Sequence, residues 1–310
     1  MAEKIKLQLE VFDDRIFDIF DPGEEIEILE TGFQFIEGPA WHSKEKHLTF
    51  SDIPASKIYR WSEKTGLTVL VDGSNKSNGN TWDLEGRLVS CEHVTSVVSR
   101  RNADGTGREV LASHYDGKEL NSPNDLVVKS DGSIYFTDPR FGRNGKNAAR
   151  VGLFREQQLS FQGVYRLEPD RGRLILLADD FGDPNGLCFS TDEKLLYVND
   201  SPRFHIRVFD VKPDGTLENS RVFAETKGEG PGVPDGLKVD IHDNVYCTAQ
   251  GGLHIYDKTG KYLGILKMPE NTANFTWGDD DFRTLYMTAS TTLYRVRVKV
   301  PGANSLRPMK

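Results

Sequence analysis

Four short polar motifs recur along this chain, and each supplies one oxygen-bearing side chain just ahead of a hydrophobic run. The motifs are Glu37-Gly38-Pro39, Pro123-Asn124-Asp125, Pro184-Asn185-Gly186 and Pro234-Asp235-Gly236. Their candidate ligands are Glu37, Asn124, Asn185 and Asp235. Carboxylate and amide oxygens suit Ca²⁺, which takes roughly six to eight oxygen ligands, and fit zinc poorly. If the four side chains meet, we expect a metal site with positions left for water and substrate.

Each motif opens one unit of a longer repeat. From Glu37 onward, short runs rich in Val, Ile, Tyr, Phe and Thr alternate with Gly, Asp and Asn turns, which predicts strands joined by hairpins. The repeat starts are Glu37, a position near Asn80, Asn124, Asn185, Asp235 and a position near Thr276. Six such units predict an all-β, six-bladed β-propeller of four-stranded blades. The first strand of each blade lines the channel of a propeller, so the candidate ligands should converge on its axis.

The two ends of the repeat region predict how the ring closes. Residues 25–30 alternate like a strand but precede the first repeat, whereas the last repeat is incomplete before Val300. We predict that this N-terminal strand pairs into the last blade, which removes exposed sheet edges. One propeller domain should span residues 25–300, between an N-terminal extension (1–24) and a C-terminal tail (301–310). Helix should be scarce, because no long stretch has apolar residues at helical spacing.

The composition limits the classes of partner. The chain has 310 residues, of which 37% are hydrophobic and 28% charged, and a formal net charge of -8 at pH 7. This balance disfavours a general nucleic-acid or anionic-membrane surface, because such surfaces gather Lys and Arg to neutralise phosphates. No apolar run approaches the roughly 18 residues that would cross a bilayer. We therefore expect small molecules or cations as partners, no nucleic acid, no membrane, and a monomer or homodimer.

The cysteines bear on the cellular compartment. Cys91, Cys188 and Cys247 lie far apart within apolar strand patterns. Buried free thiols explain them better than disulfides, which favours a reducing compartment. The first residues carry no apolar core of the kind that a secretory leader needs. The expected location is cytoplasmic, with the periplasm as the alternative if a leader has been removed.

Each motif also has a simpler interpretation. Asp235-Gly236 could be a turn in which Asp bonds the local backbone, although this pair precedes an apolar strand instead of joining two strands of one repeat. Asn124 could instead satisfy buried backbone groups. Glu37 lies between apolar segments, where a carboxylate must be paired or bound to a metal. The shared position in the repeat, more than any one residue, indicates the metal site.

Further candidates for substrate contact lie outside the four motifs. His93 and His205 follow strands whose ends could face the channel, although a lone His is more often structural. The longest interval between repeat starts, from Asn124 to Asn185, contains a polar, Gly-rich insertion at 139–162. We expect it to overhang one face and to influence substrate choice, or else to be a solvated loop. Its candidate contacts are Phe141, Arg143, Phe154 and Arg155.

The motifs and the segments between them resemble the SMP-30/gluconolactonase/LRE-like family, and within it the bacterial gluconolactonase branch. The match runs from about residue 25 to about residue 300 at family-like spacing. Besides the four motifs, it is carried by Asn78-Gly79-Asn80, Gly86-Arg-Leu-Val-Ser-Cys-Glu-His93, Tyr135-Phe-Thr-Asp-Pro139 and Gly163-Val-Tyr-Arg166. The resemblance implies a lactonase that binds a divalent cation, commonly Ca²⁺, with Mg²⁺, Mn²⁺ and Zn²⁺ as alternatives.

The resemblance also implies roles for individual residues. The residues that match the family's metal ligands are Glu37, Asn124, Asn185 and Asp235. Asp235 also matches the general base, and Asp125 matches a substrate-contacting position of some members. Ser122, a candidate contact, stands where the animal branch has an Arg that helps to hold sugar lactones. This departure weakens the case for D-gluconolactone as the substrate.

The chemistry of such a site agrees with hydrolysis of a sugar lactone. A bound cation would polarise the lactone carbonyl and lower the pKa of a water molecule, while Asp235 takes the proton. Two alternatives remain. The same metal could act on a phosphotriester or related ester, because a cation that polarises C=O also polarises P=O. The chain could also be a non-catalytic, calcium-binding propeller.

Overall fold

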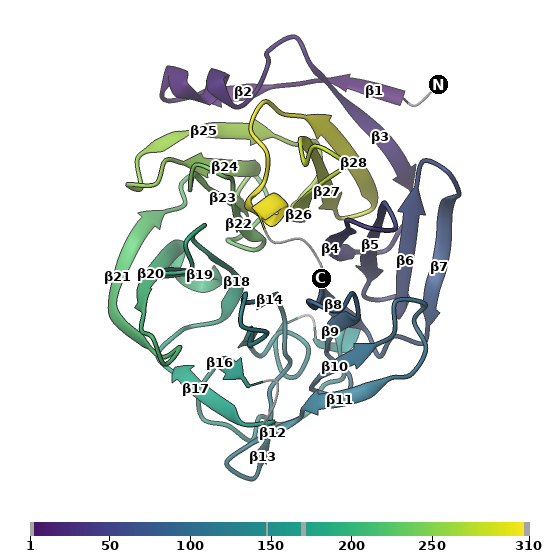
Figure 1. Cartoon of the computed structure of the whole chain (residues 1–310), viewed down its shortest axis with the longest axis vertical. Helices are drawn as coiled ribbons and strands as arrows, with labels where there is room; N and C mark the ends of the chain where they lie inside the picture. Colours follow the sequence, from purple (N-terminus) through teal and green to yellow (C-terminus); the bar gives the residue numbers. More distant parts are fainter. Residues whose placement is uncertain (1–2, 147, 169–171, 307–310) are drawn as a thin grey trace.

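The computed structural model describes residues 3–146, 148–168 and 172–306. Within these ranges, six antiparallel sheets form the blades of a ring around a central channel (Figure 1). Each blade contains four strands, and two blades carry one additional outer strand. The predicted all-β, six-bladed propeller of four-stranded blades is therefore confirmed.

The first three blades follow one another in chain order, each from the channel outward. Blade one contains β4 (Ile36–His42), β5 (His47–Asp52), β6 (Lys57–Ser62) and β7 (Gly66–Asp72). Blade two contains β8 (Ser77–Trp82), β9 (Leu88–Glu92), β10 (Val97–Arg101) and β11 (Glu109–Ala112). A small hairpin of β12 (His114–Tyr115) and β13 (Lys118–Glu119) follows. Blade three contains β14 (Leu126–Val128), β15 (Ile134–Asp138), β16 (Gly163–Leu167) and β17 (Leu174–Ala178).

The other three blades complete the ring. Blade four contains β18 (Pro184–Phe189), β19 (Leu195–Asp200), β20 (His205–Val211) and β21 (Leu217–Glu225). Blade five contains β22 (Leu237–Val239), β23 (Val245–Ala249), β24 (Gly252–Tyr256) and β25 (Tyr262–Lys267). The chain's last three strands, β26 (Thr272–Gly278), β27 (Thr284–Ala289) and β28 (Thr292–Arg297), belong to blade six.

The N-terminal segment closes the ring, as the sequence predicts. β3 (Glu25–Thr31) pairs with β28, where Ile28 lies opposite Tyr294, so blade six contains strands from both ends of the chain. β1 (Glu3–Lys6) pairs with β3, and β2 (Leu9–Val11) pairs with β25 on the outside of blade five. The closing strand satisfies backbone groups that an open sheet edge would leave exposed.

A recurring order of residues in the second strand of each blade explains how neighbouring blades pack. Tyr135 in β15 is fully buried, and the small polar residue two positions later, Thr137, reaches the next blade. Thr137 Oγ1 donates to the backbone oxygen of Asn185 at 2.8 Å. One blade later, Asn199 Nδ2 donates to the backbone oxygen of Asp235 at 2.6 Å. In these two blades, the end of the second strand thus fixes the backbone of the neighbouring innermost strand.

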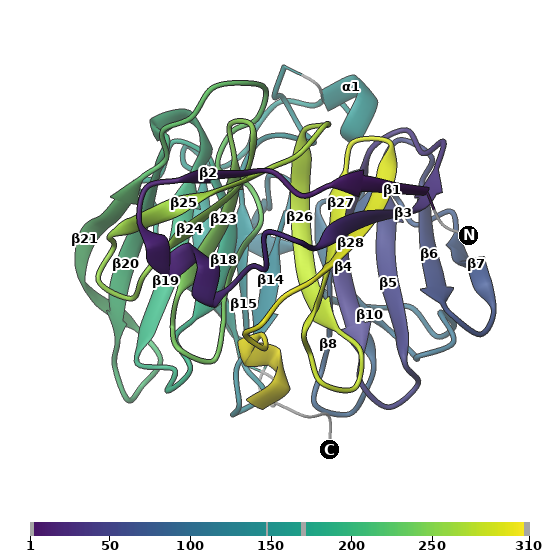
Figure 2. The same ribbon diagram turned by 90° about the horizontal axis from the view of Figure 1, so that it is seen from above.

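Helix is scarce, as expected, and the short helices mark opposite faces of the ring. They are α1 (Ala148–Val151), η1 (Asp14–Asp18), η2 (Ser201–Arg203) and η3 (Ala303–Leu306). α1 belongs to the insertion at 139–162 and lies on one face, whereas η3 lies on the other (Figure 2). We call these the α1 face and the η3 face. Among the described residues, no helix is long and apolar enough to cross a membrane.

Candidate metal centre

The four sequence motifs bring their candidate ligands to one level of the channel. Glu37 and Asn185 lie near the start of β4 and β18, and Asn124 and Asp235 come just before β14 and β22. Leu126, at the start of β14, pairs with a residue near the end of β15, where the insertion begins. This level, which we call the ligand level, therefore lies toward the α1 face.

Backbone hydrogen bonds between blades set the ligand level. The Gly186 N–H donates to Asp235 O at 3.0 Å, and the Gly79 N–H donates to Asn124 O at 2.8 Å. The residue before each glycine is therefore equivalent from blade to blade, and blade two contributes Asn78. Sequence reasoning placed this repeat start near Asn80 and missed Asn78, although the Asn-Gly pair that it forms with Gly79 repeats the Asn-Gly pair of blade four.

Glycine is required beside the ligands because neighbouring innermost strands approach very closely. A Cβ on Gly186 would lie 2.1 Å from Asp235 O, and one on Gly38 would lie 2.1 Å from Asn78 O. Both distances are far inside van der Waals contact with backbone atoms that cannot move aside. Gly38 also has a φ of 55°, which side-chain-bearing residues rarely adopt. The Gly of these motifs therefore serves packing between blades.

Three amide side chains form a hydrogen-bonded row across blades two, three and four. Asn78 Nδ2 donates to Asn124 Oδ1 at 2.6 Å, and Asn124 Nδ2 donates to Asn185 Oδ1 at 2.5 Å. Asn185 Nδ2 then donates to Ser201 Oγ at 3.1 Å. Each amide is buried and held by its neighbours, so the row presents amide oxygens in fixed positions.

Glu37 and Asp235 form a buried pair of carboxyl groups beside this row. Burial, followed by the charge of Asp125, raises the pKa of Glu37 to about 7. Burial, followed by the charge of Glu37, raises the pKa of Asp235 well above its ordinary value. Asp235 is partly exposed, although the atoms packed around it desolvate its carboxyl group. Two adjacent carboxylates of this kind require either a proton or a cation between them.

The residues fit an oxygen-preferring divalent cation. Within the described ranges, neither Glu37 nor Asp235 forms an ion pair with a Lys, Arg or His side chain. The Asn185 amide acts to lower the pKa of the neighbouring Asp235 carboxyl, so the amide row and the carboxyl pair are contiguous. Carboxylate and amide oxygens are the donors that Ca²⁺ and Mg²⁺ prefer. Two carboxyl groups without a basic partner and a set of oxygen ligands both indicate such an ion.

Asp125 and Asn274 are buried beside the carboxyl pair. Asn274 Nδ2 donates to Glu37 Oε2 at 3.0 Å and lies 3.4 Å from Asp125 Oδ2. The two residues hold positions in blades three and six that glycine holds in the other blades. Sequence reasoning selected Asp125 and missed Asn274, because blade six has no Asn-Gly or Asp-Gly pair to mark its start. The signal that could have identified Asn274 as a site residue is its polar side chain within the largely apolar strand β26.

Comparison with known proteins identifies the family. Residues 35–291 match the model of the family described as "SMP-30/Gluconolactonase/LRE-like region", which is most of the chain. The chain belongs to this family. It is 31% identical to a gluconolactonase of Zymomonas mobilis over 94% of this chain and 86% of that protein. It is 26% identical to pentonolactonase XacC of Haloferax volcanii over 85% of this chain and 84% of that protein.

A solved structure of an SMP-30/gluconolactonase/LRE-like protein agrees with the fold along the whole chain. A gluconolactonase from Xanthomonas campestris superposes with a TM-score of 0.86 at 33% sequence identity. The superposition covers 96% of this chain and 96% of the other. The likeness therefore includes both the ring of blades and the segments that close it.

In this SMP-30/gluconolactonase/LRE-like protein, His93 and Ser122 hold the insertion against the ligand level. His93 Nδ1 donates to Val151 O at 2.8 Å, and its Nε2 lies 3.5 Å from Asn78 Nδ2. Burial lowers the pKa of His93 to about 4, so the imidazole is neutral. Ser122 Oγ donates to Pro139 O at 2.7 Å and accepts from the Gly142 N–H at 3.0 Å. Both side chains are buried and used within the fold.

The remaining sequence candidates lie in the insertion and at the start of β20. Arg143 is buried, and its guanidinium donates to Glu156 O, Leu120 O and Glu119 Oε2 at 2.7 to 2.9 Å. It therefore anchors the insertion to the β12–β13 hairpin. Phe141 is partly exposed in the insertion, and His205 is partly exposed at the start of β20. Two further insertion residues differ in environment: Phe154 is 67% exposed, and Arg155 Nη2 donates to Ser96 Oγ at 2.6 Å.

A second group of possible metal-binding side chains lies in the hairpin between β4 and β5. Ligand atoms of His42, Glu45 and His47 lie within 4.8 Å of one another. This hairpin is at the opposite end of β4 from Glu37, so the group shares no residue with the ligand level. Arg60 Nη2 lies 3.9 Å from Glu45 Oε2 and adds positive charge there. The ligand level offers the better cation site because its carboxylates have no such partner.

Proposed function

We propose that the protein is a metal-dependent lactonase that opens a sugar lactone to the corresponding hydroxy acid. The observation that carries the proposal is the pair Glu37 and Asp235, two desolvated carboxyl groups beside a row of amide oxygens. Relatives that share 31 to 33% of their residues with almost the whole chain are named gluconolactonases. The relationship supports the reaction class, and the carboxyl pair supports the need for a cation.

The proposed cation is Ca²⁺, held by Glu37, Asn124, Asn185 and Asp235. When bound, such an ion polarises a carbonyl oxygen and acidifies water. The ligand set matches Ca²⁺ in its oxygen-only chemistry and in its two carboxylates. Asn78 hydrogen-bonds Asn124 and thereby orients a ligand amide. We assign Asn78 the role of a positioning residue.

Asp235 is the proposed general base. It is the partly exposed member of the carboxyl pair, whereas Glu37 is 2% exposed. A water oxygen attacks the lactone carbonyl carbon, and Asp235 accepts the water proton. The bond from that carbon to the ring oxygen then breaks, and the ring oxygen leaves as a hydroxyl after taking a proton. The products are a carboxylate and a hydroxyl on one open chain.

The structure constrains how the substrate could be recognised. Ser122 is fully buried and hydrogen-bonded to the insertion, so it does not replace the charged contact that an Arg at this position would make. Asp125 lies at the ligand level next to Asn274 and remains the proposed substrate contact. We therefore propose a sugar lactone as the substrate class and leave the individual sugar to a panel of compounds.

One experiment tests metal, reaction and substrate class together. The protein is stripped with a chelator, dialysed and restored with Ca²⁺, Mg²⁺, Mn²⁺ or Zn²⁺, and acid release is followed on aldonolactones of five and six carbons. Phosphotriesters are included as competing substrates. We expect lactone turnover that disappears on stripping and returns with Ca²⁺. Undiminished turnover of the stripped protein, or turnover of phosphotriesters alone, would contradict the proposal.

A further inference from the structure

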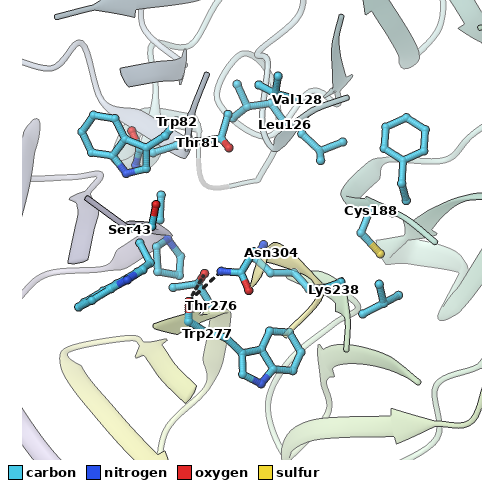
Figure 3. A pocket seen from close by; sticks show the side chains of 18 of the residues that line it. Ser43, Thr81, Trp82, Leu126, Val128, Cys188, Lys238, Thr276, Trp277 and Asn304 are labelled. Carbon is cyan, nitrogen blue, oxygen red and sulfur yellow. Dashed lines mark hydrogen bonds between the residues drawn. The ribbon is translucent and has the colours of Figure 1, made fainter. Parts of the chain in front are cut away.

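A cavity opens from the channel toward the η3 face, on the other side of the ligand level from α1. Its volume is about 390 Å³. The lining residues come later in the innermost strands than the metal-ligand candidates. Trp41 follows Glu37 within β4, and Val128 lies at the end of β14, the strand that Asn124 precedes. Asn304 of η3 forms part of the wall (Figure 3). Small-molecule sites in proteins are commonly roughly 300–1,000 Å³, so the cavity can hold a small organic molecule.

The charges of this cavity favour an anion. Among the described residues that line it, two are charged, Asp83 and Lys238. Asp83 accepts from Arg87 Nε at 2.7 Å and from the Arg87 N–H at 2.8 Å, so its charge is matched. Lys238 Nζ donates to the neutral Asn274 Oδ1 at 3.3 Å and forms no ion pair with any described residue. The cavity therefore contains one positive charge without a negative partner.

Neutral polar groups also line the wall. Thr81 and Thr276 contribute hydroxyls, and Asn304 contributes an amide. Asn304 Nδ2 donates to Trp277 O at 2.9 Å, which fixes the orientation of this amide. The wall therefore offers hydroxyl and amide groups to a polar ligand.

We propose that this cavity binds a small hydroxycarboxylate. The carboxylate pairs with Lys238, and hydroxyls of the ligand meet the polar wall at Thr81 and Thr276. The carbon chain packs on the apolar wall formed by Leu126 and Trp82, which stands across the cavity from Lys238 (Figure 3). Indoles and aliphatic side chains suit the C–H surface of such a chain. The inference does not depend on the lactonase proposal, although the product of that reaction belongs to the same chemical class.

Intrinsic fluorescence can report binding because three of the four tryptophans line the cavity. Full-length protein is stripped of metal and dialysed free of chelator, so that the ligand level cannot hold a carboxylate through a cation. It is then titrated with gluconate and with the uncharged gluconamide, and binding is repeated by calorimetry. We expect a saturable fluorescence change with gluconate and binding of gluconamide that is weaker by about tenfold or more.

Variants locate the site. Lys238→Met should weaken gluconate binding by about tenfold or more, and Lys238→Arg should retain it. Lys194→Met, at a side chain that is 80% exposed, is the matched control and should bind like the parent. If Lys238→Met disturbs folding through its Asn274 contact, Thr81→Phe fills the cavity from β8 and should abolish binding with the lysine intact.

These binding measurements test the cavity proposal independently of the lactonase proposal. No saturable change with gluconate, equal binding of gluconamide, or parental binding by both Lys238→Met and Thr81→Phe would mean a solvent-filled cavity only, and would overturn the inference. Asp235→Asn should bind gluconate normally, since it alters the ligand level and not the cavity wall. Binding that survives in a protein without lactone turnover supports the cavity while rejecting the proposed reaction, so the two proposals fail separately.

Discussion

Asn274 donates a hydrogen bond to Glu37 across 237 positions of the chain, joining the last blade to the first at the channel axis. The amide holds a carboxylate that burial and the charge of Asp125 make difficult to ionise. Its Oδ1 accepts from Lys238, so the same side chain links the carboxyl pair to the cavity on the η3 face. Closure of the ring therefore completes the candidate metal centre as well as the sheet.

Asp235→Asn should separate metal binding from catalysis. Asn keeps an oxygen ligand but cannot accept a proton, so lactone kcat should fall by about 10²-fold or more. Calcium affinity should fall much less, and calorimetry measures it. Asp214→Asn, an exposed Asp-Gly turn residue, is the matched control and should leave kcat unchanged. Turnover of Asp235→Asn at the parental rate would reject this base.

Metal binding should stabilise the fold, because it neutralises the Glu37 and Asp235 pair. With Ca²⁺ at about a hundred times its Kd, the free energy of unfolding should rise by about 2.7 kcal/mol over the stripped protein. Urea denaturation at fixed temperature gives this difference. Glu37→Gln should reduce the gain while unfolding at a similar urea concentration without metal. An equal gain in Glu37→Gln would place the cation elsewhere.

Asp138 should make stability depend on pH. Burial raises its pKa to about 8, and Asp138 Oδ1 has no hydrogen-bond partner among the described residues. A carboxyl with a raised folded pKa stabilises the fold fully below its unfolded pKa, near about 4, and loses that contribution as pH rises through about 8. Between pH 6 and pH 9, the loss should be about 2–3 kcal/mol.

The Asp138 prediction is checked by chemical denaturation at several pH values with Ca²⁺ in excess, so that the ligand level stays in one state. Asp138→Asn removes the titrating group and should flatten the profile over this interval. Asp214→Asn should follow the parental profile. A parental slope in Asp138→Asn would assign the pH dependence to another group.

Gly186→Ala should damage the ligand level through packing alone. Its new Cβ would lie 2.1 Å from Asp235 O, so the blades must separate, and stability should fall by about 3 kcal/mol. Calcium affinity should fall as well, because Asp235 moves. Gly23→Ala is the control, since its Cβ would meet only the Asp21 side chain at 3.4 Å. Thermal unfolding and calorimetry measure both effects, and a parental Tm in Gly186→Ala would contradict the predicted clash.

The fold could be predicted because its units repeat in the sequence. Motifs such as Asn185-Gly186 mark the same strand position in successive blades, and residues 25–30 show the strand that closes the ring. The role of Asn274 could not be predicted, because blade six lacks the Asn-Gly or Asp-Gly motif. This role is a hydrogen bond to Glu37, which belongs to another blade. His93 and Arg143 could not be placed, since their hydrogen bonds are made with the insertion, whose path has no repeat to guide it.

By itself, the sequence determined the number of blades, the closing strand and the oxygen chemistry of Glu37, Asn185 and Asp235. These properties follow from local patterns that recur at nearly constant spacing. Only the tertiary structure decided which side chains touch across blades, how far Glu37 and Asp235 are desolvated, and that Lys238 faces a cavity without a negative partner among the described residues. Those features depend on ångström-scale approach between strands far apart in the chain, which no local pattern encodes.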